Sequence, residues 1–140
     1  MAAMHLIADL LVSDDEQVLM RILEGDFLNE ALKVLYCNPD QDKLTTLFAL
    51  SNVVASRKHV RYAVEQEELM DRVMELARHQ ESKVMGEACW VLTNALTVSD
   101  EETRALFAKS MHQSLTDVIS YLLAELTRLD MKEHLVEVLQ

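Results

Sequence analysis

The chain carries the segment LFALSNVV at residues 47–54 and, 42 residues later, the segment CWVLTNAL at residues 89–96. In this alignment the aromatic Phe48 falls under the aromatic Trp90, and Asn52 falls under Asn94. The remaining positions are apolar or carry a hydroxyl group in both copies. Self-similarity at a fixed period of this length is typical of repeat architectures, so the sequence predicts a fold of stacked units.

A second pattern has the same period. Within each copy it places apolar residues at i, i+4, i+7 and i+8, which is one face of an α-helix and not the alternation of a strand. A weaker column upstream indicates a shorter helix before this one. The four main columns are Phe27, Leu69 and Met111; Ala31, Val73 and Leu115; Val34, Leu76 and Val118; and Leu35, Ala77 and Ile119, and the weaker column is Ile22, Val64 and Leu106.

Capping signals support the start of the short helix. Ser13-Asp14-Asp15 and Ser99-Asp100-Glu101 each offer an N-cap residue followed by acids at the positive end of the helix dipole. The middle copy begins with Ser56-Arg57-Lys58, which is a weaker cap. Asn38-Pro39-Asp40 reads as a turn before the longer third helix.

Each unit is therefore expected to contain a short helix, a second helix and a longer third helix. The third helices are expected at 42–55 and 84–98. We expect one domain over 1–140, with a partial unit at 1–13 followed by units at 14–56, 57–98 and 99–140. The partial unit begins inside the register of a third helix.

Composition agrees with an all-α chain. The 140 residues are half hydrophobic and include only two glycines and one proline, which disfavours a β-sandwich or barrel. The net charge of −11 would repel nucleic acid and anionic membrane surfaces and attract a basic peptide, although ordinary acidic cytosolic proteins have the same balance.

The cysteines and the N-terminus bear on location. Cys37 and Cys89 form no CxxC motif, which fits a reducing compartment. The first residues lack the basic region of a signal peptide, and no apolar run is long enough to cross a bilayer. We expect a protein of the cytoplasm, the nucleus or both, without a membrane partner.

The third-helix motif resembles that of one repeat family. The Trp90–Asn94 segment, with Glu87 one turn upstream, resembles the Trp-x-x-x-Asn signature of importin-α (karyopherin-α), an armadillo-repeat adaptor for nuclear localisation signals. The Phe48–Asn52 segment is the same motif with Phe in the place of Trp. The resemblance implies a right-handed, armadillo-type superhelical solenoid of about three repeats, with the third helices lining a concave groove.

The resemblance also implies functions for individual residues. Asn52 and Asn94 would hold the backbone of an extended peptide, because an amide both donates and accepts. Trp90 and Phe48 would form slots for the stems of lysine or arginine, with Glu87 as the nearest carboxylate and Asp100 just beyond. The partner would then be a protein or peptide, and a basic one. A lone Trp is more often packed in a core, so the sequence leaves a core position for Trp90 open.

The sequence departs from the family in several places. Ser56 and Val98 stand where importin-α often has an acid, so the carboxylate supply is reduced. Leu10 and Val136 occupy the asparagine place in the outer units, with Leu6 and Lys132 in the aromatic place. The ladder is therefore two asparagines long. The basic arm that binds importin-β is also absent, so autonomous nuclear transport is not implied.

Two other functions were considered. Apolar residues in the first and last helices would be uncovered in an isolated solenoid, which would suit a scaffold, a homo-oligomer or a piece of a longer protein; these residues are Leu6, Leu10, Leu11, Leu135, Val136, Val138 and Leu139. An enzyme is disfavoured, since no nucleophile–base pair is found and the five histidines lack metal-ligand spacing. We expect no catalytic residue, metal or cofactor.

Overall fold

The computed structural model describes residues 2–11, 15–108, 116, 119–120 and 123–124. Helices account for the regular structure of this part of the chain, which contains no strand. They are α1 (Ala2–Leu11), α2 (Glu16–Glu24), α3 (Phe27–Cys37), α4 (Asp40–Val54), α5 (Val60–Val64), α6 (Glu67–Leu76) and α7 (Ser82–Val98), followed by a helical stretch at 101–108.

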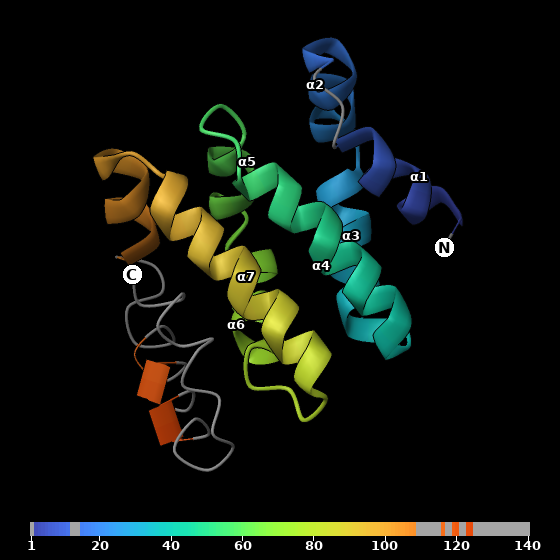
Figure 1. Cartoon of the computed structure of the whole chain (residues 1–140). Helices are drawn as coiled ribbons and strands as arrows, with labels where there is room; N and C mark the ends of the chain where they lie inside the picture. The colour runs from blue at the N-terminus through green and yellow to red at the C-terminus, as the bar shows by residue number, and fades with distance from the viewer. Residues whose placement is uncertain (1, 12–14, 109–115, 117–118, 121–122, 125–140) are drawn as a thin grey trace.

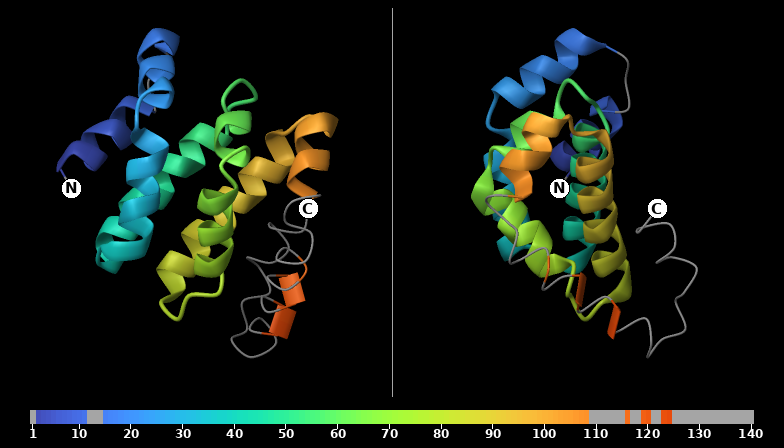
Figure 2. Two further views of the ribbon diagram at one scale, coloured as in Figure 1. Left: turned by 180° about the vertical axis from the view of Figure 1, so that it is seen from behind. Right: turned by 90° about the vertical axis from the view of Figure 1, so that its left-hand side faces the viewer.

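The helices form two layers. α4 packs against α1 on one side and against α7 on the other, and the three lie side by side toward the viewer in Figure 1. α3 and α6 pack against each other behind them, and the side view in Figure 2 separates the layers. The order of short, second and third helix occurs twice, as α2–α3–α4 and α5–α6–α7. The fold is an α-solenoid, as the 42-residue period predicts.

The core lies between the layers. The columns that share one face of the second helices are buried in both full copies, apart from the half-buried Val34. The buried members are Phe27, Ala31, Leu35, Leu69, Val73, Leu76 and Ala77. In the last copy, Met111, Leu115 and Val118 lie outside the described residues, and Ile119 is exposed, which the column did not predict.

Capping decides where the helices begin. The Asp15 carboxylate accepts from the backbone N–H groups of Gln17 and Val18, so this acid is the N-cap of α2. α5 has no side-chain cap, as the weaker signal in the middle copy indicated.

Both third helices begin two residues earlier than predicted. α4 begins at Asp40 because Pro39, at φ −59°, already has a helical φ and its carbonyl accepts from Asp42 and Lys43. α7 begins at Ser82 because the Glu81 carboxylate accepts from the Val84 N–H.

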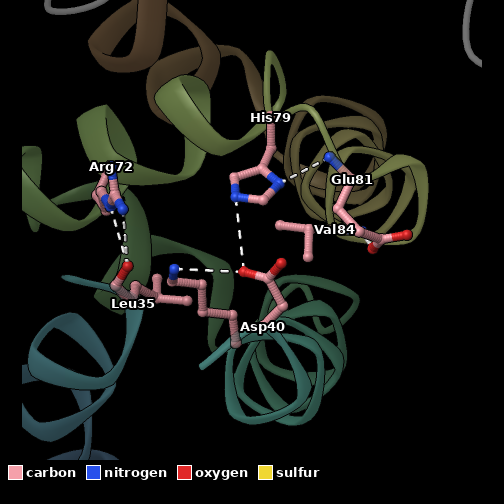
Figure 3. A network of polar contacts seen from close by, with 7 residues as sticks. Leu35, Asp40, Arg72, His79, Glu81 and Val84 are labelled. Atoms are coloured by element: carbon pink, nitrogen blue, oxygen red, sulfur yellow. Dashed lines mark hydrogen bonds and ion pairs between the residues drawn. The ribbon is translucent and has the colours of Figure 1, made fainter. Parts of the chain in front are cut away.

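Polar contacts join the two full units at the ends of their helices (Figure 3). Nε and Nη2 of Arg72, on α6, donate to the carbonyl of Leu35 on α3 at 3.0 and 2.9 Å. The N–H of Glu81 donates to Nδ1 of His79, so Nε2 carries the ring proton and faces Asp40 Oδ1 at 3.6 Å. These contacts fix the second unit against the first.

Candidate functional site

One row of large apolar side chains is exposed on the layer of third helices. Leu6 on α1, Phe48 on α4 and Trp90 on α7 are 60%, 47% and 48% exposed. Each stands 42 residues from the next, so the row follows the repeat. Trp90 is therefore not a core residue. Its side chain is exposed, as the Trp-x-x-x-Asn motif predicted. We call the surface bearing this row the α1–α4–α7 face.

The rest of α7 explains why Trp90 is exposed. Ala88, Val91, Leu92 and Ala95 are buried against the other helices. At 100° per residue these positions occupy the side of the helix away from Trp90. Packing of α7 on its small and branched residues thus leaves the indole outside the core.

Asn94 lies one turn after Trp90 on the side of α7 that faces α4. Its Nδ2 donates to the carbonyl of Ser51 on α4 at 3.4 Å. The amide thus keeps one N–H and the carbonyl oxygen for another partner. Ser51 was not among the predicted site residues, although the alignment of LFALSNVV with CWVLTNAL places it next to the first motif asparagine.

Asn52 differs from Asn94. Its side chain is partly exposed, but its Nδ2 is buried and has no hydrogen-bond partner among the described residues. A buried donor without an acceptor costs about 1–3 kcal/mol. Asn52 occupies on α4 the repeat position that Asn94 occupies on α7, and Asn94 reaches the preceding third helix, so the repeat places Asn52 on the side of α4 that faces α1. Asn52 and Asn94 therefore belong to the same face but to different helix boundaries.

Glu87 is the carboxylate of the predicted site that remains available. It is half-buried and lies seven residues before Asn94, so it shares the side of α7 that faces α4. No ion pair or hydrogen bond of its carboxylate occurs within the described part of the chain.

Asp100, the other nearby acid, has a different function. Its carboxylate accepts from the Thr103 N–H at 2.8 Å, and that backbone hydrogen bond is the main reason that the pKa of Asp100 is lowered. Asp100 therefore caps the helical stretch at 101–108. The capping signal placed the start of this helix correctly but made Ser99 the N-cap, which is wrong by one residue, because the Asp100 carboxylate takes the free N–H group.

The outer positions are only partly described. Leu10 occupies the asparagine place on α1 and is half-buried. Because a leucine side chain has no amide, the ladder has no third amide at this end. The side chain of Leu11 lies outside the described residues, as do Lys132, Leu135, Val136, Val138 and Leu139.

Outside this face, the described residues provide neither a reactive buried thiol nor a metal-binding group. Cys89 is buried, and burial raises the pKa of its thiol to about 11, which makes it a poor nucleophile. No group of three or more His, Cys, Asp or Glu side chains is placed to hold a metal ion in this part of the chain. None of the helices at the positions described combines the length and apolarity needed to cross a membrane.

Comparison with known proteins identifies the type of fold. No protein-family model and no curated protein matches the chain. Among solved structures it is similar to a designed armadillo repeat protein in complex with the peptide (KR)4, with a TM-score of 0.59 and 14% sequence identity. The match covers 98% of this chain and 70% of that one. The α-solenoid is thus of the armadillo type. The comparison does not show a specific similarity to importin-α.

Proposed function

We propose that this chain binds an extended peptide across the α1–α4–α7 face. The observation that carries the proposal is the exposure of Phe48 and Trp90 on the same face as Asn52 and Asn94, at equivalent positions of two neighbouring helices. Exposed aromatic side chains next to amides form an amphipathic surface of the kind found at interfaces. The structural neighbour, which has a peptide in complex, has the same fold.

The amides suit a peptide backbone. A side-chain amide offers donors and an acceptor at once, so it can bind the N–H and C=O groups of an extended chain whatever its sequence. Asn94 has one N–H left after its bond to Ser51. The Asn52 donor has no partner among the described residues, and it would gain an acceptor if the amide turned toward a bound carbonyl.

The aromatic side chains suit a basic peptide. A lysine or arginine stem between Phe48 and Trp90 would bury apolar area, and its charge would gain about 0.5–2 kcal/mol over a ring. Glu87 lies at the same boundary, and the chain has a net charge of −11. The peptide in complex with the structural neighbour, (KR)4, consists of Lys-Arg repeats. The resemblance to importin-α adds a nuclear localisation signal as the first natural peptide to test, and with it a place in the cytoplasm or the nucleus.

The test compares asparagine variants. Labelled (KR)4 peptide is titrated by fluorescence anisotropy into the wild type and into the double variant Asn52→Ala, Asn94→Ala. Loss of both amides should weaken binding about 5-fold to 150-fold, since each backbone bond contributes about 0.5–1.5 kcal/mol and two are lost. The matched control is Asn29→Ala, because Asn29 is exposed on α3 in the other layer and bonds only to Asp26.

Thermal melts of both variants separate loss of binding from loss of folding. A folded double variant with wild-type affinity would contradict the proposal, and so would equal weakening by Asn29→Ala. A peptide in which every basic residue is replaced by Gln tests the basic preference separately. If the affinity for that peptide equals the affinity for (KR)4, the chain binds peptides but does not select for positive charge.

A second candidate is self-association. Leu6 is the most exposed large apolar side chain of the described residues, and a second copy of the chain could cover it. Light scattering over a concentration series tests this, with Leu6→Glu as the variant that should remain monomeric. A wild type that is monomeric at every concentration eliminates this candidate.

A further inference from the structure

The exposed side of α7 carries a glycine in the middle of the helix. Gly86 is exposed and lies one turn before the exposed Trp90. A Cβ atom at Gly86 would lie more than 4 Å from every described heavy atom other than those of its chain neighbours and the adjoining helix backbone. A glycine inside a helix is destabilising relative to alanine. Since no close contact requires a glycine here, its effect is to leave open space beside Trp90.

The equivalent position of α4 carries a side chain. Leu44 precedes Gly86 by 42 residues and Phe48 by four, and it is half-buried and packs against the core. Side chains of a helix lean toward its N-terminus, so the residue one turn before an aromatic side chain lies next to that ring. The position next to Phe48 is thus occupied by a leucine, whereas the position next to Trp90 has no side chain.

The open space lies on the flank of Trp90 that is away from α4. The Asn94 side chain donates to a carbonyl of α4, so it marks the side of α7 that faces α4. Around the helix, Glu87 lies about 20° from Asn94, and measured from Glu87 in that direction Trp90 lies at about 60° and Gly86 at about 100°. Trp90 therefore separates the Glu87 carboxylate from the space at Gly86.

The outer stripe of α7, as we name it, has little that would bind a basic side chain. Its members are Lys83, Gly86, Trp90, Thr93 and Thr97. The one charged member is the exposed Lys83, which would repel a lysine or an arginine. The hydroxyl groups of Thr93 and Thr97 donate to carbonyl groups of α7 itself at 2.8 and 2.7 Å. A ligand on this stripe therefore meets an indole ring with room beside it and no carboxylate.

We infer that the outer stripe binds an uncharged aromatic side chain of the peptide, stacked against Trp90 in the space that Gly86 leaves. The inference rests on the proposed function, in which basic side chains bind on the other flank of Trp90. Offset or edge-to-face rings have centroids about 4.5–7 Å apart, and a large side chain at position 86 would obstruct that approach. Gly86 thus determines specificity, and the preferred partner carries an aromatic residue in addition to basic ones.

The experiment scans labelled (KR)4, with each residue in turn replaced by phenylalanine or by cyclohexylalanine, which has the same carbon skeleton without the aromatic ring. At the position that reaches the outer stripe, the wild type should bind the phenylalanine peptide about 2-fold to 12-fold more tightly, which is the gain of an aromatic pair beyond burial. In Gly86→Leu this ratio should fall below about 1.5-fold, because the leucine side chain takes the space.

Two further variants make the comparison specific. The matched control is Gln17→Leu, since Gln17 is an exposed, uncharged residue of α2 outside the α1–α4–α7 face, and its ratio should equal that of the wild type. Thermal melts should show that Gly86→Leu is at least as stable as the wild type, because leucine favours a helix more than glycine does. If Gly86→Leu melts lower, Gly86→Ala takes its place, and its ratio should lie below that of the wild type.

The outcomes separate this inference from the proposed function. The inference is wrong if no position of the scan prefers phenylalanine, if the substituted Gly86 variant keeps the full ratio, or if Gln17→Leu lowers it equally. The proposed function survives in those cases, provided that the double asparagine variant still weakens the binding of (KR)4. A wild type that binds neither (KR)4 nor any scanned peptide refutes both.

Discussion

Replacing Arg72 by methionine tests whether a single side chain fastens the two full units together. Leu35 lies in the last turn of α3, and the residue four positions later, Pro39, has no N–H to donate to its carbonyl. Arg72 supplies that donor from α6 through two hydrogen bonds (Figure 3). Its guanidinium also lies over the Tyr36 ring, 4.6 Å from the centroid, and pairs with Glu75 at 2.8 Å.

The expected loss can be estimated from these contacts. The carbonyl left without a partner costs about 1–3 kcal/mol because Leu35 is fully buried. Loss of the cation–π contact adds about 0.5–1 kcal/mol, and the half-exposed pair with Glu75 adds about 0.5 kcal/mol or less. We expect Arg72→Met to lower the free energy of unfolding by about 2–4 kcal/mol, and Tm by about 6–12 °C for a chain of this size.

The assay is urea unfolding followed by circular dichroism. Arg72→Lys keeps the charge but not the fork of donors, so it should lose about half as much. Glu75→Gln isolates the ion pair and should cost about 0.5 kcal/mol or less. The matched control is Arg57→Met, at an exposed arginine that makes no ion pair with any other described residue. If Arg72→Met is no more destabilising than Arg57→Met, the carbonyl does not depend on Arg72 and the reasoning is refuted.

Three further predictions concern α7 and the cysteines. Gly86→Ala should raise the free energy of unfolding by about 0.5–1 kcal/mol, because Gly86 is exposed within a helix and a Cβ there would meet no heavy atom within 4 Å; a lower Tm would contradict this. At pH 8 the exposed Cys37 should react with a thiol reagent, while Cys89 should react at least about 100-fold more slowly until urea unfolds the chain, since its raised pKa leaves little thiolate. The same pKa predicts that the free energy of unfolding falls by up to about 3 kcal/mol as pH rises from about 9 to about 11, because in this range the Cys89 thiol ionises only in the unfolded chain. In Cys89→Ala this pH-dependent loss should be absent.

Much of the candidate site could be found from the sequence. The repeat identified the third helices, and the matched pairs of aromatic and asparagine residues placed Phe48, Trp90, Asn52 and Asn94 on one face. Exposure of both aromatic side chains agrees with that expectation. Asp100 was less well predicted, because an acid near the start of a helix can serve either as a ligand or as a cap. Here the Thr103 N–H donates to its carboxylate, so Asp100 is a cap.

The amino-acid sequence alone was enough to predict the period, the buried face of each helix and the residues opposite that face, because these depend only on 3.6 residues per turn and on which side chains are apolar. It could not determine which flank of each third helix meets which neighbour. That was decided by the packing of α1, α4 and α7, which ties Asn94 to the Ser51 carbonyl and leaves the Asn52 donor without a partner among the described residues. The same holds for Arg72 and Leu35, since a contact between two residues that lie 37 positions apart and in different units depends on how the helices stack and not on any local pattern.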